Sequence, residues 1–292
     1  PQIEKKDLFL MEKTAITIIA DVSGSMSGNS LRKMQSALIA FINQLPEKHN
    51  INIIAFDDNH YKLFNYPKPL TVNTKQQALR FVRNLEAKGG TNMFPAVYEA
   101  ILEKPVLPMK HQIVLMTDGA IGYEAEMMAL VHEHIGDKKF HIVGIGSAPN
   151  SFFIKGLAQV GNGSYLYVND NIKKKITTLL YKINRPVLEN LRIVLPQQHE
   201  VLPKQFPDVL ANDPITFYIK IPQSSIADLD QPFTIKGNQG SKPWSFSVMP
   251  DQIQQGKNLD QLWAREKINS LSFKRGIGFL DSRQYEHQVT QL

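Results

Sequence analysis

The sequence contains no cysteine and no long apolar run, and each absence excludes a class of protein. Without cysteine the 292-residue chain forms neither disulfides nor thiolate metal sites, although this does not distinguish the cytoplasm from a bacterial exterior. No apolar stretch approaches the roughly 18 residues of a membrane span, and no basic-then-apolar leader stands at the N-terminus. Because the chain begins with Pro1, we expect a piece of a larger protein whose signal or anchor would lie outside it.

The chain also has little excess charge of either sign. Lys and Arg number 33 against 27 Asp and Glu, which gives a net charge of +6, and 42% of the residues are hydrophobic. These values are typical of a soluble protein that buries a full core. The basic run Lys173-Lys174-Lys175 falls in a helical pattern, where it favours a solvated face. We therefore expect no nucleic-acid binding.

Short apolar runs alternate with helical patterns between residues 14 and 184. The runs are Thr14–Ala20, Ile51–Phe56, Gln112–Met116, Phe140–Ile145 and Ser164–Val168. Because they are too continuously apolar for a sheet with one wet face, they predict parallel strands that are covered on both faces. Helical spacing between the runs, as in Leu31, Met34 and Leu38, completes the prediction of an α/β fold with a doubly wound, mostly parallel sheet.

The pattern changes at about Arg185. Prolines become frequent, and strand-like runs at 191–195, 215–221, 233–236 and 244–249 predict a small antiparallel β unit. A helix is expected from about Asn258 to Leu271, with Trp263 packed on that unit. We therefore predict an α/β domain at residues 13–184, and a β-rich accessory unit with C-terminal helices at residues 1–12 and 185–292. The strand-like Leu8–Met11 would pair with the accessory unit.

Polar residues follow two of the predicted strands. Asp21, Ser23 and Ser25 alternate in a loop directly after the first strand, and Asp118 follows the run that ends at Met116. Ligands of an open parallel sheet bind outside the carboxyl ends of its strands. If the two strands are neighbours, both acids and the loop containing Thr91 can share one hard divalent cation, because such ions prefer carboxylate and hydroxyl oxygens.

The sequence D-x-S-x-S at Asp21–Ser25, followed by Thr91 and Asp118, resembles the metal-ion-dependent adhesion site of the von Willebrand factor type A family. The resemblance implies a von Willebrand factor A-like fold in which these five residues hold Mg²⁺, or Mn²⁺ or Ca²⁺, and leave a coordination position open for a partner's carboxylate. The amphipathic stretch Asp260–Ile268 is similar to the segment after the A domain in inter-alpha-trypsin inhibitor heavy chains and in bacterial surface proteins of similar construction.

These resemblances imply a function in adhesion and not in catalysis. We expect cation-dependent binding of a protein or extracellular-matrix ligand through an acidic residue of that ligand, at an extracellular or cell-surface location that includes the periplasm. The alternative is an intracellular scaffold domain that docks onto a partner such as an ATPase complex. A metal-assisted hydrolase would need a general base near the cation, and no His or free carboxylate is placed for it in the sequence.

Several of these residues also permit plainer interpretations. The D-x-S-x-S loop suits a helix N-cap, and Thr91 with Pro95 suits a helix start. The run Asp57-Asp58-Asn59 is either a source of a further ligand or a solvated turn.

Two other motifs are weak. His132 and His134 stand two apart on a predicted helix and point to different faces, so they do not predict a zinc site. Gly144-Ile145-Gly146 is followed by Pro149 where a dinucleotide loop needs its third glycine, which favours an ordinary loop.

Overall fold

A computed structural model describes residues 13–105, 109–119, 121–146, 148–184, 188–195, 199–204, 206, 209, 216–222, 232–239, 242–249, 256–276 and 278–292. The chain divides into two compact units, Pro1–Arg185 and Pro186–Leu292. Among the described residues, no helix has the length and apolarity to cross a membrane. The predicted strand Leu8–Met11 lies outside the described residues, so its pairing stays a prediction.

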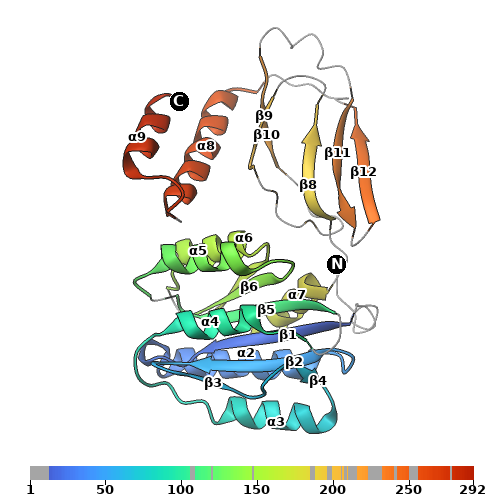
Figure 1. The fold of residues 1–292 in the computed structure, drawn as a ribbon, viewed down its shortest axis with the longest axis vertical. Coiled ribbons are helices and arrows are strands. Elements are labelled where there is room, and N and C mark those ends of the chain that lie inside the picture. The colour runs from blue at the N-terminus through green and yellow to red at the C-terminus, as the bar shows by residue number, and fades with distance from the viewer. Residues whose placement is uncertain are drawn as a thin grey trace. The chain divides into compact units, whose positions relative to one another are not determined.

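The first unit is built on a twisted sheet with the strand order β3-β2-β1-β5-β6-β7 (Figure 1). Strands β1, β2, β5, β6 and β7 run parallel, while β3 and the short β4 pair antiparallel with β2. Their bounds are β1 Thr14–Asp21, β2 Asn50–Phe56, β3 His60–Lys62, β4 Lys68–Pro69, β5 Lys110–Thr117, β6 Lys139–Ile145 and β7 Tyr165–Val168. The predicted α/β class and the five parallel strands are confirmed.

Helices cover both faces of this sheet. Their bounds are α2 Asn29–Gln44, α3 Val72–Arg83, α4 Met93–Leu102, α5 Glu124–His134, α6 Ser151–Val160 and α7 Ile172–Asn184. Helix α2 packs against α3 and α7, and α5 packs against α4 and α6. Ile16, Ile18 and Ala20 of β1 belong to the cluster with α2, α3 and α7, and are fully buried. Because side chains alternate along a strand, Thr17 and Asp21 belong to the opposite set.

Two local predictions need correction. Helix α6 was not anticipated from the sequence, although Asn150 caps it by accepting a hydrogen bond from the Phe153 backbone N–H. Of the motif Gly144-Ile145-Gly146, only Gly146 follows the strand, because Gly144 and Ile145 belong to β6 as the predicted strand Phe140–Ile145 has it. A Cβ on Gly144 would lie 2.7 Å from Ile154 Cδ1 and from Tyr167 Cδ1, so glycine permits close packing there.

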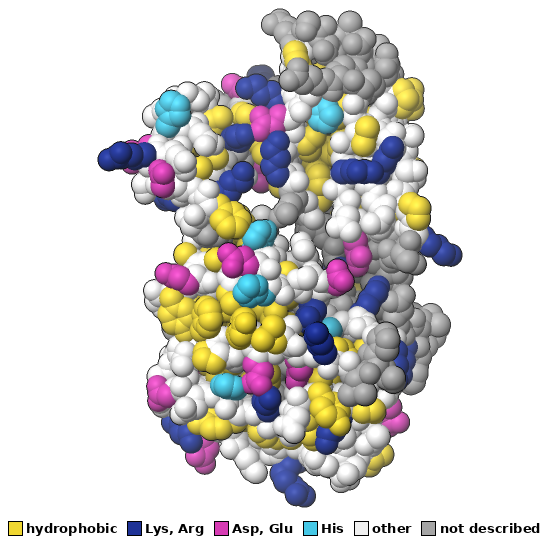
Figure 2. All heavy atoms as spheres, in the orientation of Figure 1, with side chains coloured by type: hydrophobic (Ala, Val, Ile, Leu, Met, Phe, Trp, Pro, Cys, Tyr) yellow, Lys and Arg dark blue, Asp and Glu magenta, His cyan; other side chains and the backbone are white. Residues whose placement is uncertain are grey.

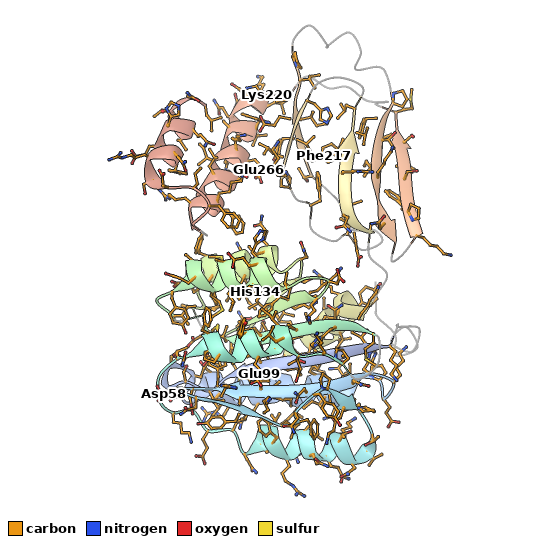
Figure 3. All side chains as sticks on the ribbon, viewed as in Figure 1. Asp58, Glu99, His134, Phe217, Lys220 and Glu266 are labelled. Carbon is orange, nitrogen blue, oxygen red and sulfur yellow. The ribbon has the colours of Figure 1, made fainter. Side chains whose placement is uncertain are left out.

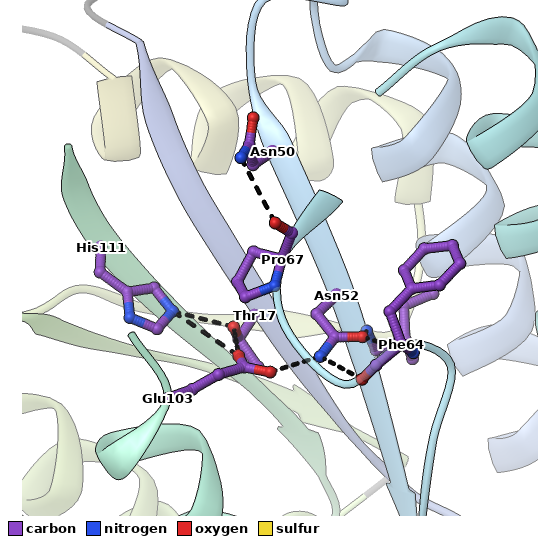
Figure 4. Close-up of polar contacts among 8 residues, drawn as sticks. Thr17, Asn50, Asn52, Phe64, Pro67, Glu103 and His111 are labelled. Carbon is purple, nitrogen blue, oxygen red and sulfur yellow. Dashed lines mark hydrogen bonds and ion pairs between the residues drawn. The ribbon is translucent and has the colours of Figure 1, made fainter. Parts of the chain in front are cut away.

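A buried polar network ties the end of α4 to the sheet (Figure 4). Glu103, which caps the C-terminus of α4, accepts hydrogen bonds from the Thr17 hydroxyl and the Asn52 amide. Asn52 also bonds both backbone groups of Phe64, and His111 Nε2 lies 2.8 Å from the Thr17 oxygen. Burial raises the pKa of Glu103, an effect that the Thr17 and Asn52 hydrogen bonds partly offset. The network fixes α4 against β1 and β2.

The second unit contains two antiparallel sheets in its described residues. One has the order β12-β11-β8, with β8 at Leu188–Val194, β11 at Phe233–Gln239 and β12 at Lys242–Val248. The other pairs β9 (Glu200–Leu202) with β10 (Tyr218–Lys220). Prediction from the sequence missed β9 and placed the other strands within a few residues. Residue 215, where one predicted strand began, lies outside the described residues.

The described part of the second unit also contains the helices α8 at Leu259–Gly276 and α9 at Ser282–Thr290. Helix α8 packs against β9 and β10, as expected for the helix that carries Trp263. Trp263 is half-buried and not a core residue. The Lys220 Nζ atom lies 4.6 Å from the centroid of its ring, so this lysine covers part of the indole surface.

Candidate functional site

The carboxyl ends of β1 and β5 bring the first predicted ligands together. The two strands are parallel neighbours in which Ala20 pairs with Met116, so Asp21 and Thr117 stand side by side at the same edge. Asp21 is fully buried. Its Oδ1 atom accepts the Ser23 backbone N–H at 3.0 Å, and its Oδ2 atom accepts the Thr117 hydroxyl at 2.5 Å. This carboxylate is therefore held rigidly at the base of the site.

The serines of the loop keep their hydroxyls together. Ser23 is buried and Ser25 is exposed, and their Oγ atoms lie 3.0 Å apart. Neither serine caps a helix, because the N-cap of α2 is Gly28 without a side-chain bond, and Ser23 makes no capping bond to the 3-10 helix η1 (Gly24–Met26). The N-cap interpretation of D-x-S-x-S is therefore wrong for the serine hydroxyls.

A short relay joins the loop of Asp118 to Asp21. The Gly119 backbone N–H donates to Thr117 Oγ1 at 2.9 Å, and the Thr117 hydroxyl donates in turn to Asp21. Asp118 itself is half-buried directly after β5, and its backbone carbonyl accepts the Asn150 N–H at 3.0 Å. The relay places the second predicted acid beside the first.

The electrostatics of Asp21 reflect this crowding. Burial raises its pKa, the hydrogen bonds from Ser23 and Thr117 lower it, and the negative charge of Asp118 raises it again, with a net value above the ordinary one. The negative charge of Asp118 thus adds to the effect of burial on Asp21. A bound cation would reverse that effect, because it compensates both charges.

The Thr91 loop lies against the serine loop. The Gly24 N–H donates to the Gly89 carbonyl at 3.0 Å, and the Lys88 N–H donates to the Val22 carbonyl at 2.9 Å. Thr91 is half-buried just before α4, whose N-cap is Asn92 without a side-chain capping bond. The hydroxyl of Thr91 is therefore not used as the helix cap that the sequence also permitted.

Two side chains hold this loop, a role that the sequence predicted for neither of them. Asp58 Oδ1 accepts the Gly90 N–H at 2.9 Å, and Figure 3 labels Asp58 at this edge of the first unit. The Tyr123 hydroxyl donates to the Thr91 carbonyl at 2.8 Å and accepts the Met93 N–H at 2.9 Å. Asp58 is exposed and its neighbour Asp57 is buried, where Asp57 accepts from Asn59 and Tyr61. These interactions make the run a structured turn.

The position of Gly89 leaves no room for a larger side chain. Its φ is +67°, and a Cβ there would lie 2.3 Å from Asp58 Oδ2, whereas Gly136 has a φ of +56° with nothing within 4 Å. We expect Gly136→Ala to lower the free energy of unfolding by about 1 kcal/mol and Gly89→Ala by about 2 kcal/mol, since only Gly89→Ala also displaces Asp58.

Urea unfolding of the wild type, of Gly89→Ala and Gly136→Ala, of Asp58→Ala and of the Gly89→Ala/Asp58→Ala double mutant measures this difference. The double-mutant cycle should give a coupling of about 1 kcal/mol. A cycle without coupling would contradict the role assigned to Asp58.

The donor set fits a small, hard cation. Adjacent ligands of an octahedral Mg²⁺ with bonds of about 2.1 Å lie about 3 Å apart, which matches the separation of the Ser23 and Ser25 oxygens. The same distance is also that of an ordinary hydrogen bond between hydroxyls. Carboxylate and hydroxyl oxygens are hard ligands, whereas Zn²⁺ prefers the softer nitrogen and sulfur atoms of His and Cys.

The histidine pair lies elsewhere. His132 and His134 are both exposed on α5, and the His134 ring packs edge-on against Tyr98 at 5.8 Å between centroids.

Comparison with known proteins supports the fold of this unit. The family model of the von Willebrand factor type A domain matches residues 14–167. A von Willebrand factor A domain-containing protein of Dictyostelium discoideum is 28% identical over 186 residues, which cover 62% of this chain and 20% of that protein. The protein mono-ADP-ribosyltransferase PARP4 of Mus musculus is 25% identical over 290 residues, 95% of this chain and 14% of that protein.

Solved structures show the same architecture. A von Willebrand factor type A protein of Catenulispora acidiphila has a TM-score of 0.63 at 13% identity, covering 96% of this chain and 82% of that one. The ArnB paralog VWA2 of Sulfolobus acidocaldarius has a TM-score of 0.53 at 16% identity, and the match covers 97% of this chain and 79% of that one. The chain spans about a fifth of the length of the Dictyostelium relatives. Because they are eukaryotic, they do not support the bacterial surface protein to which the Asp260–Ile268 resemblance points.

Proposed function

Because the chain belongs to the von Willebrand factor type A family, a family of protein-interaction modules, we propose that it binds a partner protein through a divalent cation at the carboxyl ends of β1 and β5. The observation that carries the proposal is the gathering of Asp21, Ser23 and Ser25 beside Asp118 at one edge. The side-chain oxygens of Asp21, Ser23 and Ser25 do not cap the helices that follow, so they are available to a cation.

Each residue has a distinct role in this proposal. Asp21 and Asp118 supply negative charge, while Ser23, Ser25 and Thr91 offer neutral oxygens. Two carboxylates balance the charge of a dication but leave it short of ligands, so a partner carboxylate can complete the set. Mg²⁺ suits the separation of the serine oxygens, and Mn²⁺ or Ca²⁺ are the alternatives.

We further propose that the module acts by binding and not by catalysis, at a cell surface or in the extracellular space. The resemblance of Asp260–Ile268 to inter-alpha-trypsin inhibitor heavy chains motivates this location. The transferase activity in the name of PARP4 belongs to that protein, of which this chain matches only 14%.

Calorimetric titration of the whole chain with MgCl₂ tests the proposal. We expect binding at a single site, and Ser25→Ala should weaken it at least about tenfold, because the substitution removes an exposed oxygen ligand without disturbing the core. Ser27→Ala is the matched control. Ser27 is an exposed serine two residues further along the same loop, and its loss should change the affinity by less than about twofold.

Two results would contradict the proposal. Heats of dilution alone in the wild type would show that the chain binds no Mg²⁺. Equal affinities of wild type and Ser25→Ala would place the cation elsewhere. Titration with ZnCl₂ under the same conditions provides a comparison, because the oxygen donors favour the harder ion.

A further inference from the structure

Helix α4 has an apolar outer face that the fold of the first unit leaves partly uncovered, with the Tyr98 ring against His134 of α5. Its buried face consists of Met93, Ala96, Val97, Ala100 and Ile101. On the opposite face, Phe94, Tyr98 and Leu102 recur every four residues and are 40%, 39% and 54% exposed. Figure 2 shows hydrophobic side chains gathered over this helix. Three aligned residues form a continuous stripe and not the scattered exposure that is ordinary on protein surfaces.

The contrast with α3 shows that this face is not a general property of the unit. Beyond the exposed Val72 in its first turn, the exposed positions of α3 are polar and include Arg80 and Arg83, as expected for a helix with one face in water. The only charged residue in α4 is Glu99. A helix that is apolar on both faces is typical of a buried helix or of one with a partner on each side.

A hollow of about 480 Å³ borders the stripe. Its walls are Tyr98, Glu99, Leu102 and Glu103 of the α4 segment and His60 and Lys62 of β3. Glu99 pairs with Lys62 and with His60, whose Nε2 atom lies 2.6 Å from Glu99 Oε2 (Glu99 is labelled in Figure 3). The hollow is therefore lined by two carboxyl groups and one lysine, with His60 beside Glu99.

Glu103 is the more buried of these acids, at 8% exposed. It accepts hydrogen bonds from the neutral Thr17 and Asn52 side chains, and His111 Nε2 lies 4.0 Å from its Oε2 atom. A basic side chain entering the hollow would add a positive charge beside these two acids. The aromatic ring of Tyr98 and the aliphatic Leu102 would contact the apolar stem of a lysine or arginine.

We propose that the stripe and the hollow, here called the α4 face, dock an extended segment of the same partner protein whose acidic residue reaches the metal site. This inference rests on the proposed function. The segment carries apolar side chains against Phe94, Tyr98 and Leu102 and a Lys or Arg that enters the hollow. Along this partner segment, an acidic residue is thus followed by apolar residues and then by a basic residue.

The position and stiffness of α4 fit this arrangement. The helix begins two residues after Thr91, so the stripe starts at the metal site. From Thr91 to Leu102 the helix rises about 16 Å, the span of about five extended residues. Tyr123 holds the backbone before α4, and Glu103 fixes its other end to the sheet. A rigid helix presents its side chains at a low entropic cost of binding.

Selection of random peptides of about twelve residues, displayed on phage, against the whole immobilised chain in MgCl₂ tests the inference. We expect the enriched peptides to carry an acidic residue and, within about five residues of it, an apolar residue and a Lys or Arg. Repeating the selection on Glu99→Gln, which frees Lys62, should remove the preference for the basic residue.

The affinity of one selected synthetic peptide then gives a quantitative comparison. Phe94→Ser and Leu102→Ser should each weaken it at least about tenfold, while the control Phe152→Ser, at an exposed Phe of α6, should change it by less than about twofold. Circular dichroism of each variant confirms that it is folded.

The outcomes separate the two proposals. Peptides that require Mg²⁺ but bind Phe94→Ser and Leu102→Ser as tightly as wild type would overturn the α4 face and leave the proposed function standing. Peptides that need the α4 face and bind equally in EDTA would overturn both, because the acidic residue would then have no cation to contact. A selection without enrichment would also overturn the α4 face as a surface for linear segments.

Discussion

Asn52→Ala is expected to lower the free energy of unfolding of the first unit by about 3 to 5 kcal/mol. The Asn52 amide is fully buried, where its Nδ2 atom donates to the Phe64 carbonyl at 2.9 Å and to Glu103. Its Oδ1 atom accepts the Phe64 N–H at 3.0 Å. Alanine would leave three buried polar groups without partners, and each such group costs about 1 to 3 kcal/mol.

Urea unfolding followed by far-ultraviolet circular dichroism measures the change. Both tryptophans, Trp244 and Trp263, lie in the second unit, so their fluorescence records that unit separately and provides an internal reference. Asn65→Ala is the matched control, because Asn65 is exposed in the connection after β3 and should contribute less than about 0.5 kcal/mol. A loss below about 1 kcal/mol for Asn52→Ala would show that water replaces the amide in the network.

The same network bears on function, because it fixes the helix that begins beside the metal site. Glu103 anchors the C-terminus of α4 through β1 and β2. If this anchor loosens, the N-terminal end with Thr91 still has the Tyr123 hydroxyl. We therefore expect Asn52→Ala to reduce stability more than it reduces Mg²⁺ affinity.

The parallel sheet could be predicted from the sequence because each of its strands contains a continuous apolar run, such as Ile18–Ala20, Ile53–Phe56 and Ile113–Met116. All eight residues of β1 are buried, and so are all seven of β2, which is the pattern of a strand covered on both faces. Helix α6 was harder to identify, since Gly156 lies inside it and Gly161 and Gly163 follow it. Glycine weakens a helical pattern in the sequence, whereas here close packing against Phe140 requires it at Gly161 and Gly163.

The candidate ligands could be found from the sequence, but their supports could not. Asp21, Ser23 and Ser25 form a local motif, whereas the Thr117 bond to Asp21 spans 96 residues and the Asp58 bond to Gly90 spans 32. Such bonds depend on strand order and on the approach of two loops, which no local pattern specifies. Asp58 also stands in a run that is typical of a solvated turn, so the sequence gives no sign that its carboxylate accepts the Gly90 N–H.

The largest effect on cation binding is expected for Asp118→Ala. Asp118 would supply one of the two charges that hold the dication, and its negative charge raises the pKa of Asp21 when no cation is present. Removing it should weaken Mg²⁺ binding by at least about a hundredfold, or about 2.7 kcal/mol. The backbone of residue 118 keeps its bond from the Asn150 N–H, so the loop should remain in place.

Thermal unfolding in EDTA and in MgCl₂ separates a ligand from a structural residue. Wild type should gain about 2.7 kcal/mol when Mg²⁺ is present at about a hundred times its dissociation constant. Asp118→Ala should gain almost nothing, yet in EDTA it should stay within about 0.5 kcal/mol of wild type, because it loses the repulsion of Asp21 together with its own contacts. Asp137→Ala, at an exposed acid beyond α5, should behave as wild type in both solutions. If Asp118→Ala gained as much from Mg²⁺ as wild type does, Asp118 would not be a ligand, and the cation would have to be held by Asp21 and the hydroxyls alone.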